Sequence, residues 1–152
     1  MKKNVSTAEK VKKGKKKVSM IEQSHLHDCE DLRKSLPGLS GKKVIQKYEQ
    51  VLSENQRIEL INEKTVYYVG IGTGAGEDDL EGCYLWHKHE QVGYRYELLD
   101  GLGRGAFGEV VKAYDHKAGE LVAVKIVRAG REQMHLALNE INILMSIKEK
   151  DI

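Results

Sequence analysis

Three short features in the last third of the chain carry residues that are able to do chemistry together. Residues 103–110 form a glycine-rich turn, residues 122–127 form a strand-like run that contains Lys125, and a helical segment holds Glu140. A loop that covers a triphosphate must bring its backbone N–H groups close to the oxygens, and glycine has no Cβ to obstruct that approach. Lys125 supplies a cation for the phosphates, and Glu140 supplies a carboxylate that would hold the ammonium in place. The set predicts a site for the phosphates of a nucleotide.

The glycine turn has the form of a hairpin between two strands. Its close-approach positions are Gly103, Gly105 and Gly108. Phe107 is expected at the tip of the turn, and Val110 is expected to press on the base of the nucleotide from above. The glycine loop of a dinucleotide-binding fold would open directly into a helix, whereas the residues after Gly108 alternate as a strand does. A glycine pattern alone is a weak signal, and the lysine-bearing strand at the right distance makes it specific.

Length and composition allow one domain, or a small domain with an extension, in 152 residues. The net charge is only +2, but eight lysines fall in the first eighteen residues, a run that we expect to be disordered. This tail is either a nuclear-import or polyanion-binding segment or a solvated basic tail with no receptor. Two cysteines, with no apolar stretch of the signal-peptide or membrane-spanning kind, indicate a reduced intracellular protein in the cytoplasm, the nucleus or both, with no membrane partner.

The region upstream of the glycine turn is predicted to be mainly helical. Apolar residues at a helical spacing predict a short amphipathic helix over residues 40–52, with Ser40 as a possible N-cap. Residues 53–56 read as a capping box that opens a second helix, which continues to about Asn62.

Strands and one long helix are predicted for the rest of the chain. Residues 66–69 predict a short strand, residues 70–92 a loop, and residues 131–150 a helix. Strand-like runs flank the glycine turn and hold Lys125; they cover residues 94–99, 110–114 and 122–127. The apolar stripe of the long helix consists of Met134, Leu138, Ile141 and Met145. Glu140 is expected next to this stripe.

Two other clusters resemble sites of a different kind. Residues 70–75 match a dinucleotide glycine pattern, but the carboxylates of residues 77–79 follow instead of a helix and would repel a pyrophosphate. The metal-capable side chains are His25, His27, Cys29, Cys83, His87 and His89. Neither of their clusters has the Cys-x-x-Cys spacing of a structural zinc site. We therefore expect neither a dinucleotide site nor a metal site in the chain.

Several segments of the chain are similar in sequence to one protein family. In the last third they are residues 94–97, 110–117 and 137–144; upstream they are Tyr48, Leu52, Ser53, Glu59, Leu60 and residues 66–70. Residues 77–84 and 87–89 match an acidic box and a histidine-bearing linker. On these residues the chain, from about residue 39 to residue 151, resembles the dual-specificity tyrosine-regulated kinases, in the branch with an N-terminal accessory region. Residues 70–76, which are unusually rich in glycine, and residues 56–58 depart from the pattern.

The resemblance implies an α+β fold that contains the first three strands and helix C of a kinase N-lobe. It divides the chain into a disordered basic tail (1–36), a helical accessory region (37–76), an acidic and histidine-bearing linker (77–93) and a partial kinase N-lobe (94–152). It implies that Lys125 and Glu140 form the catalytic ion pair and that Leu144 joins a packed hydrophobic spine. The ATP-binding residues that it implies are Leu102, Gly103, Arg104, Gly105, Ala106, Phe107, Gly108, Glu109, Val110, Ala123 and Lys125.

The resemblance also implies a function, which is ATP- and Mg²⁺-dependent phosphorylation of serine and threonine on protein substrates, with autophosphorylation of one tyrosine. The sequence contains no His-Arg-Asp, Asp-Phe-Gly or Ala-Pro-Glu, so the catalytic base, the Mg²⁺ ligands and the C-lobe have no counterpart in it. We therefore expect these residues to carry part of the ATP site of a parent kinase and to be inactive alone. One alternative is a non-catalytic module that binds a partner through its long helix. The other, a nucleic-acid-binding module, is disfavoured because aromatic residues do not interleave with the lysines.

Overall fold

The computed structural model describes residues 34–70 and 77–150. Contacts divide the chain into two units, residues 1–69 and residues 70–152. The lysine run and the upstream histidines and cysteine lie outside the described residues, as does the predicted boundary at residue 76. Residues 77–93, predicted as a linker, fall in the same unit as the predicted N-lobe.

The first unit contains two short helices, α2 (Gly41–Tyr48) and α3 (Glu54–Leu60). Helix α3 begins with the predicted capping box. The Ser53 hydroxyl accepts a hydrogen bond from the Gln56 backbone N–H at 3.2 Å, and the Gln56 side-chain oxygen accepts one from the Ser53 N–H at 3.0 Å. Ser40 occupies the N-cap position of α2, but its side chain makes no capping hydrogen bond. The two reciprocal bonds at α3 satisfy N–H groups that the helix itself leaves without an acceptor.

Two predictions for the first unit were wrong, one in the length of a helix and one in the presence of a strand. Helix α2 ends at Tyr48 and not at residue 52, because the Tyr48 carbonyl accepts from both Val51 and Leu52 and the chain closes into a turn. Residues 66–69 form no strand. Val66 makes a single bridge with Leu39, and the residue after Leu39 is already the N-cap of α2, so the pairing does not extend.

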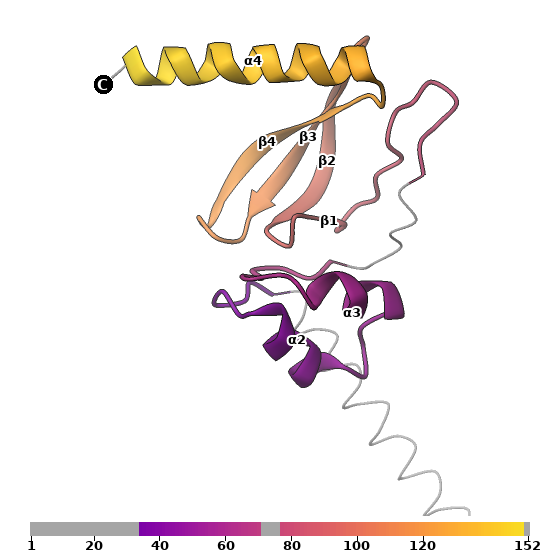
Figure 1. Cartoon of the computed structure of the whole chain (residues 1–152), viewed down its shortest axis with the longest axis vertical. Helices are drawn as coiled ribbons and strands as arrows, with labels where there is room; N and C mark the ends of the chain where they lie inside the picture. Colours follow the sequence, from indigo (N-terminus) through magenta and orange to yellow (C-terminus); the bar gives the residue numbers. More distant parts are fainter. Residues whose placement is uncertain (1–33, 71–76, 151–152) are drawn as a thin grey trace, which may run out of the picture. The chain divides into compact units, whose positions relative to one another are not determined.

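The second unit is built on an antiparallel sheet whose strands are hydrogen-bonded in chain order (Figure 1). The strands are β1 (Gln91–Val92), β2 (Tyr96–Gly105), β3 (Gly108–Asp115) and β4 (Glu120–Val127). Strand β1 was not predicted, since residues 70–92 were expected to be a loop. Strand β2 continues six residues further than predicted, so only Ala106 and Phe107 remain as the turn between β2 and β3. The glycine turn is therefore the tip of a long hairpin.

One face of this sheet is buried. Leu98 of β2 and Val111 and Ala113 of β3 are fully buried. The partly buried side chains that pack against them are Trp86, Tyr96, Val122, Val124 and Ile126. Side chains alternate between the two faces along a strand, so the residues between these ones lie on the opposite face. That opposite face carries Val110 and Lys125, which are directly paired across β3 and β4.

An ion pair closes the base of the β2–β3 hairpin. Arg95 donates to both carboxylate oxygens of the buried Asp115, at 2.8 Å from Nε and 2.5 Å from Nη2. The same carboxylate accepts from the backbone N–H groups of Lys117 and Ala118 in the turn that leads to β4. The Arg95 guanidinium and these turn N–H groups outweigh the effect of burial and hold the pKa of Asp115 well below its usual range. This end of the hairpin is thus fixed by charge-assisted hydrogen bonds as well as by packing.

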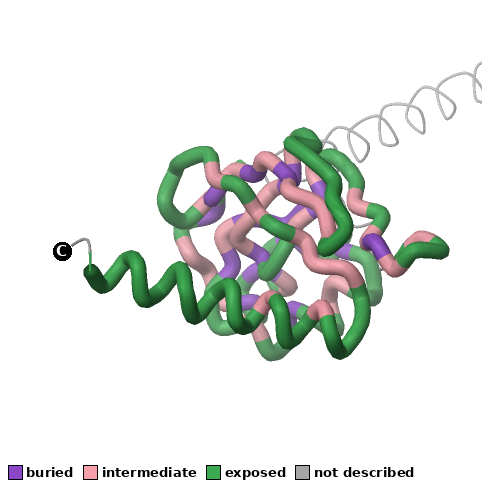
Figure 2. The backbone as a smooth tube through the Cα atoms, turned by 90° about the horizontal axis from the view of Figure 1, so that it is seen from above, coloured by how far each residue is buried: buried purple, intermediate pink, exposed green. Residues whose placement is uncertain are grey.

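Helix α4 (Arg131–Lys150) follows β4 and lies across one end of the strands in Figure 1. The predicted bounds of the helix are confirmed. None of its residues is buried, and Figure 2 shows it exposed along nearly its whole length. The predicted apolar stripe is about half exposed or more, from 47% at Ile141 to 62% at Met134. The outer edge of β4 pairs with no strand in residues 34–70 and 77–150, so both the stripe and this edge are open in the part of the chain that the structure describes.

Candidate functional site

The structure brings Lys125 and Glu140 together. Lys125 lies in β4 on the open face of the sheet, and Glu140 lies in the third turn of α4. The Lys125 ammonium donates to the Glu140 carboxylate at 2.5 Å. Their side chains are 39% and 48% exposed, so the pair is solvated and contributes at most about 1 kcal/mol to folding. The value of this pair therefore lies in where it places a cation.

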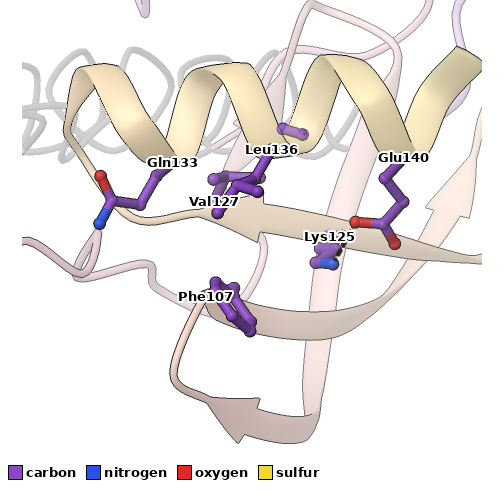
Figure 3. Close-up of a pocket in the computed structure, with 7 residues that line it drawn as sticks. Phe107, Lys125, Val127, Gln133, Leu136 and Glu140 are labelled. Carbon is purple, nitrogen blue, oxygen red and sulfur yellow. Dashed lines mark hydrogen bonds and ion pairs between the residues drawn. The ribbon is translucent and has the colours of Figure 1, made fainter.

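The pair lines a cavity of about 220 Å³ together with Phe107 of the hairpin tip. Its lining residues are Phe107, Lys125, Val127, Gln133, Leu136, Ala137 and Glu140. Figure 3 shows Phe107 facing the helix from the hairpin, with Val127 and Lys125 on the strand between them. Each of the lining residues on the helix lies three or four positions from at least two of the others, which places them on one face of α4. This inward face differs from the apolar stripe that the sequence analysis singled out, and three of its members, Gln133, Leu136 and Ala137, were not predicted as site residues.

The three predicted close-approach glycines are not equivalent. At Gly103 and Gly105, an added Cβ would meet no other atom within 4 Å. Neither glycine is therefore required by packing among the described residues, and both leave the backbone open to a close approach from outside. Gly108 is different: its φ is +144°, and a Cβ there would clash with the carbonyl oxygen of Ile126. The fold itself requires Gly108, in addition to any role beside a ligand.

The remaining predicted ATP-binding residues lie on the hairpin and on β4 but do not line the cavity. Val110 is directly opposite Lys125, and Ala123 lies two positions away on the same face of β4. Leu102 is 59% exposed and falls where the pairing of β2 with β3 shifts register. Ala106 precedes Phe107 in the turn, and Glu109 pairs with Arg104 across the hairpin. Together they lie on the hairpin and β4 outside the cavity, which Phe107 and Lys125 line.

Sequence reasoning missed a set of ion pairs beside the hairpin tip. Arg104 forms an ion pair with Asp79, and Arg128 lies 3.4 Å from Glu81. Arg104 and Asp79 are twenty-five residues apart, so no local pattern would have connected them. In the sequence itself, the available signal was the presence of an acidic segment upstream of a glycine turn that contains an arginine.

Three histidines of the second unit, His87, His89 and His116, lie beside carboxylates. His89 Nδ1 lies 2.6 Å from one oxygen of Glu97, and His116 Nε2 lies 2.8 Å from the other. Burial would raise the pKa of Glu97, but these two hydrogen bonds outweigh it and the pKa is lowered. His87 lies beside Glu90, while Cys83 is buried. Within residues 34–70 and 77–150, no three histidine, cysteine or acidic side chains gather as a metal site.

The arrangement as a whole has the charge and the open backbone that a polyphosphate site requires. An ammonium held by a carboxylate lies below a hairpin whose glycines leave the backbone accessible, and an apolar wall adjoins it.

No helix in the described part of the chain has the length and apolarity that crossing a membrane requires.

Comparisons with known proteins place this site in context. No protein-family model matches the chain. The chain is 32% identical over 150 residues to human dual specificity tyrosine-phosphorylation-regulated kinase 3, a match that covers 86% of the chain and 26% of the kinase. It is 32% identical over 127 residues to dual specificity tyrosine-phosphorylation-regulated kinase 2 from Drosophila melanogaster, a match that covers 74% of the chain and 18% of that kinase. It is also 32% identical over 124 residues to human dual specificity tyrosine-phosphorylation-regulated kinase 4, and this match covers 74% of the chain and 24% of that kinase. The chain thus spans about a quarter, or less, of the length of these relatives.

Proposed function

Because this chain belongs to the family of dual-specificity tyrosine-phosphorylation-regulated kinases, we propose that it carries the ATP-binding part of a protein kinase. The parent kinase phosphorylates serine and threonine on other proteins and one tyrosine on itself. The observation that carries this proposal is the Lys125–Glu140 pair beneath the glycine hairpin. A cytoplasmic or nuclear location belongs to the same proposal.

The residues of the site divide the work of holding ATP. Lys125 contacts the α- and β-phosphates, and Glu140 keeps the ammonium at the cavity wall, where the phosphates pass. The backbone of Gly103 and Gly105 approaches the phosphate oxygens, since no Cβ stands in the way. Leu102 and Val110 sandwich the adenine ring, and Ala123, which shares the open face with Lys125 and Val110, lies at the edge of the ring.

Mg²⁺, which kinases use together with ATP, would supply positive charge to neutralise the phosphates. Its ligands in kinases are carboxylate and amide side chains that follow the N-lobe in the chain. In residues 34–70 and 77–150 no cluster of acidic side chains is placed to hold it. We therefore assign no Mg²⁺ ligand in the described part, and expect weak ATP binding and no phosphoryl transfer from these 152 residues alone.

Calorimetric titration of the whole chain with ATP tests the nucleotide site. We expect Lys125→Ala to weaken ATP binding about tenfold, which corresponds to about 1.4 kcal/mol. Lys117→Ala is the matched control, because Lys117 is an exposed lysine in the turn at the opposite end of β3 and should leave the affinity unchanged. Equal affinities of the wild-type chain and Lys125→Ala, or no binding at millimolar ATP, would contradict the proposed site.

A transfer assay tests the expectation that the chain is inactive alone. ATP, Mg²⁺ and a generic protein substrate are added to the 152-residue protein, and phosphate incorporation is measured. Incorporation that Lys125→Ala abolishes would overturn this expectation, because it would mean that these residues suffice for catalysis.

A non-catalytic interaction module is the second candidate, and the exposed apolar residues of α4 favour it. Leu138, Ile141 and Met145 are each about half exposed, as a surface that contacts another protein would be before it is covered. An immunoblot against residues 39–70 distinguishes the two. A band far above 17 kDa supports the parent kinase, whereas a single band near 17 kDa supports the interaction module.

A further inference from the structure

An acidic loop lies against the tip of the β2–β3 hairpin. We define the acidic loop as residues 77–85, which turn back on themselves through the bridge between Asp78 and Tyr84. From this loop Asp79 forms an ion pair with Arg104, and Glu81 lies 3.9 Å from the same guanidinium. Arg104 stands between Gly103 and Gly105, so the acidic loop reaches the segment that is proposed to cover the phosphates.

The internal hydrogen bonds of the acidic loop orient Asp79. Its Oδ1 accepts from the backbone N–H groups of Glu81 and Cys83, each at 2.9 Å. The other oxygen, Oδ2, is left for Arg104. The loop N–H groups, first that of Cys83, and the Arg104 guanidinium lower the pKa of Asp79, so the carboxylate is charged at neutral pH. The carboxylate is therefore fixed in direction before it meets the guanidinium, which reduces the side-chain entropy that an exposed ion pair usually loses.

A second connection runs through the residues that follow β4. Arg128 Nη2 lies 3.4 Å from the Glu81 carboxylate and donates to the Gly105 carbonyl at 3.3 Å. The backbone N–H of Arg128 donates to the Phe107 carbonyl at 3.2 Å, and that of Ala129 donates to the Gly82 carbonyl at 2.8 Å. Both sides of the hairpin tip and the acidic loop thus share one hydrogen-bonded network.

The acidic loop is itself anchored at its far end. Tyr84 donates a hydrogen bond to the buried carboxylate of Glu90, which also accepts from the His87 N–H at 2.8 Å. Burial and the neighbouring Glu90 carboxylate raise the pKa of Tyr84 to about 12, so the phenol stays protonated and keeps donating. Because of this anchor, an ion pair with the loop restrains the hairpin.

The hairpin tip has few other restraints. All residues from Gly101 to Phe107 are exposed. Without side-chain packing, strand pairing with β3 and the network of Asp79, Glu81 and Arg128 are the contacts that order it. A free tip would lose conformational entropy when it closed over a ligand, and a tip that is already ordered loses less.

We propose that Asp79 is a positioning residue for the nucleotide, which acts by holding Arg104 and thereby keeping the hairpin tip in one position over the phosphate side of the cavity. It touches neither the nucleotide nor Lys125. The effect on ATP affinity rests on the proposed function, whereas the restraint on the hairpin does not.

Amide hydrogen exchange on the full chain tests the restraint directly. Asp79→Asn keeps an oxygen for the loop N–H groups but removes the charge that Arg104 meets. We expect exchange of the amides at residues 101–107 to rise about threefold, as the loss of an exposed ion pair implies. Asp78→Asn is the matched control, because it removes the same charge from the adjacent exposed position and should leave this exchange unchanged.

Variants at Arg104 separate the restraint from damage to the acidic loop. Arg104→Gln leaves the loop intact and should raise exchange as Asp79→Asn does, the double variant should add nothing further, and Arg104→Lys should restore most of the protection. Wild-type exchange in both Asp79→Asn and Arg104→Gln would overturn the proposal.

ATP titration of the same variants completes the test. We expect the dissociation constant to rise about threefold in Asp79→Asn and Arg104→Gln, without additivity in the double variant. Unchanged affinity alongside increased exchange would overturn the positioning role. If the wild-type chain binds no ATP, the proposed function fails, while the exchange data still decide whether Asp79 restrains the hairpin.

Discussion

The two ends of the β2–β3 hairpin are held by different forces. At the base, Leu98 and its partner Ala113 are fully buried, and Arg95 binds the buried Asp115 through two hydrogen bonds. At the tip, every residue from Gly101 to Phe107 is exposed, and solvated ion pairs supply the contacts to the neighbouring loop. Packing fixes one end, while charge restrains the other.

This difference is suited to a hairpin that serves both stability and the proposed ligand binding. Buried apolar contacts hold the base in a single arrangement because close-packed side chains resist displacement. Exposed ion pairs are weak and reversible, so the tip is able to adjust when a ligand enters. The base determines where the tip lies, and the ion pairs restrain the tip less firmly than packing would. Changes at the base should therefore alter folding, and changes at the tip should alter binding.

Truncation of Leu98 should produce the largest effect, at the base. Leu98→Ala leaves a cavity in the buried face of the sheet and should lower the free energy of unfolding by about 3 kcal/mol. Trp86, the only tryptophan, packs against this cluster, so its fluorescence during urea unfolding measures the loss. The matched variant at the tip is Leu102→Ala, which removes an exposed leucine and should cost less than about 0.5 kcal/mol. Similar losses at both sites would contradict the contrast between base and tip.

Substitution of the hairpin glycines should have the next largest effect. Gly108→Ala introduces a Cβ against the Ile126 carbonyl at a φ that side chains rarely adopt, and should destabilise the sheet by about 2 kcal/mol. Gly105→Ala places the same methyl group in open space and should leave the urea midpoint nearly unchanged, while it weakens ATP binding. Unfolding and ATP titration of both variants sharpen the distinction between a glycine that the fold requires and one that the ligand requires. A destabilised Gly105→Ala would argue against it.

Mild acid should produce the smallest of these effects, and at the base it acts through Asp115. Because the folded-state pKa of Asp115 is lowered, its contribution is fully present above the unfolded pKa of about 3.9 and is lost as pH falls toward the folded value. We expect stability to be constant from pH 7 to pH 5 with respect to this group and to decline below about pH 4. Urea unfolding of the wild-type chain and of Asp115→Asn at several pH values isolates the group. The difference between the two should shrink in acid, and a constant difference would refute the assignment.

Local patterns in the sequence predicted the elements whose contacts are local. The capping box at Ser53 and Gln56 spans four residues, and the hairpin turn around Phe107 joins neighbouring strands. Such elements need no distant partner to be recognised. The α+β class followed from them together with the family resemblance, and the structure confirms it.

Elements that depend on distant residues escaped prediction. Strand β1 has two residues and exists because β2 pairs with it, so no alternation was visible in the sequence. Residues 66–69 have strand-like composition, but the partner segment at Leu39 offers one residue pair before a helix begins. At the site, the spacing of Lys125 and Glu140 was readable, whereas the inward face of α4 and the pairing of Asp79 with Arg104 required the arrangement in space.

The order of the strands has a consequence for how the second unit acquires its structure. Each strand pairs with the next one in the chain, from β1 to β4, and α4 then follows β4 directly. The closure of each hairpin therefore requires only short loops, which carry a small entropic cost and allow fast folding. We expect the sheet to assemble stepwise from its N-terminal end, with the glycine hairpin formed before Lys125 pairs with Val110.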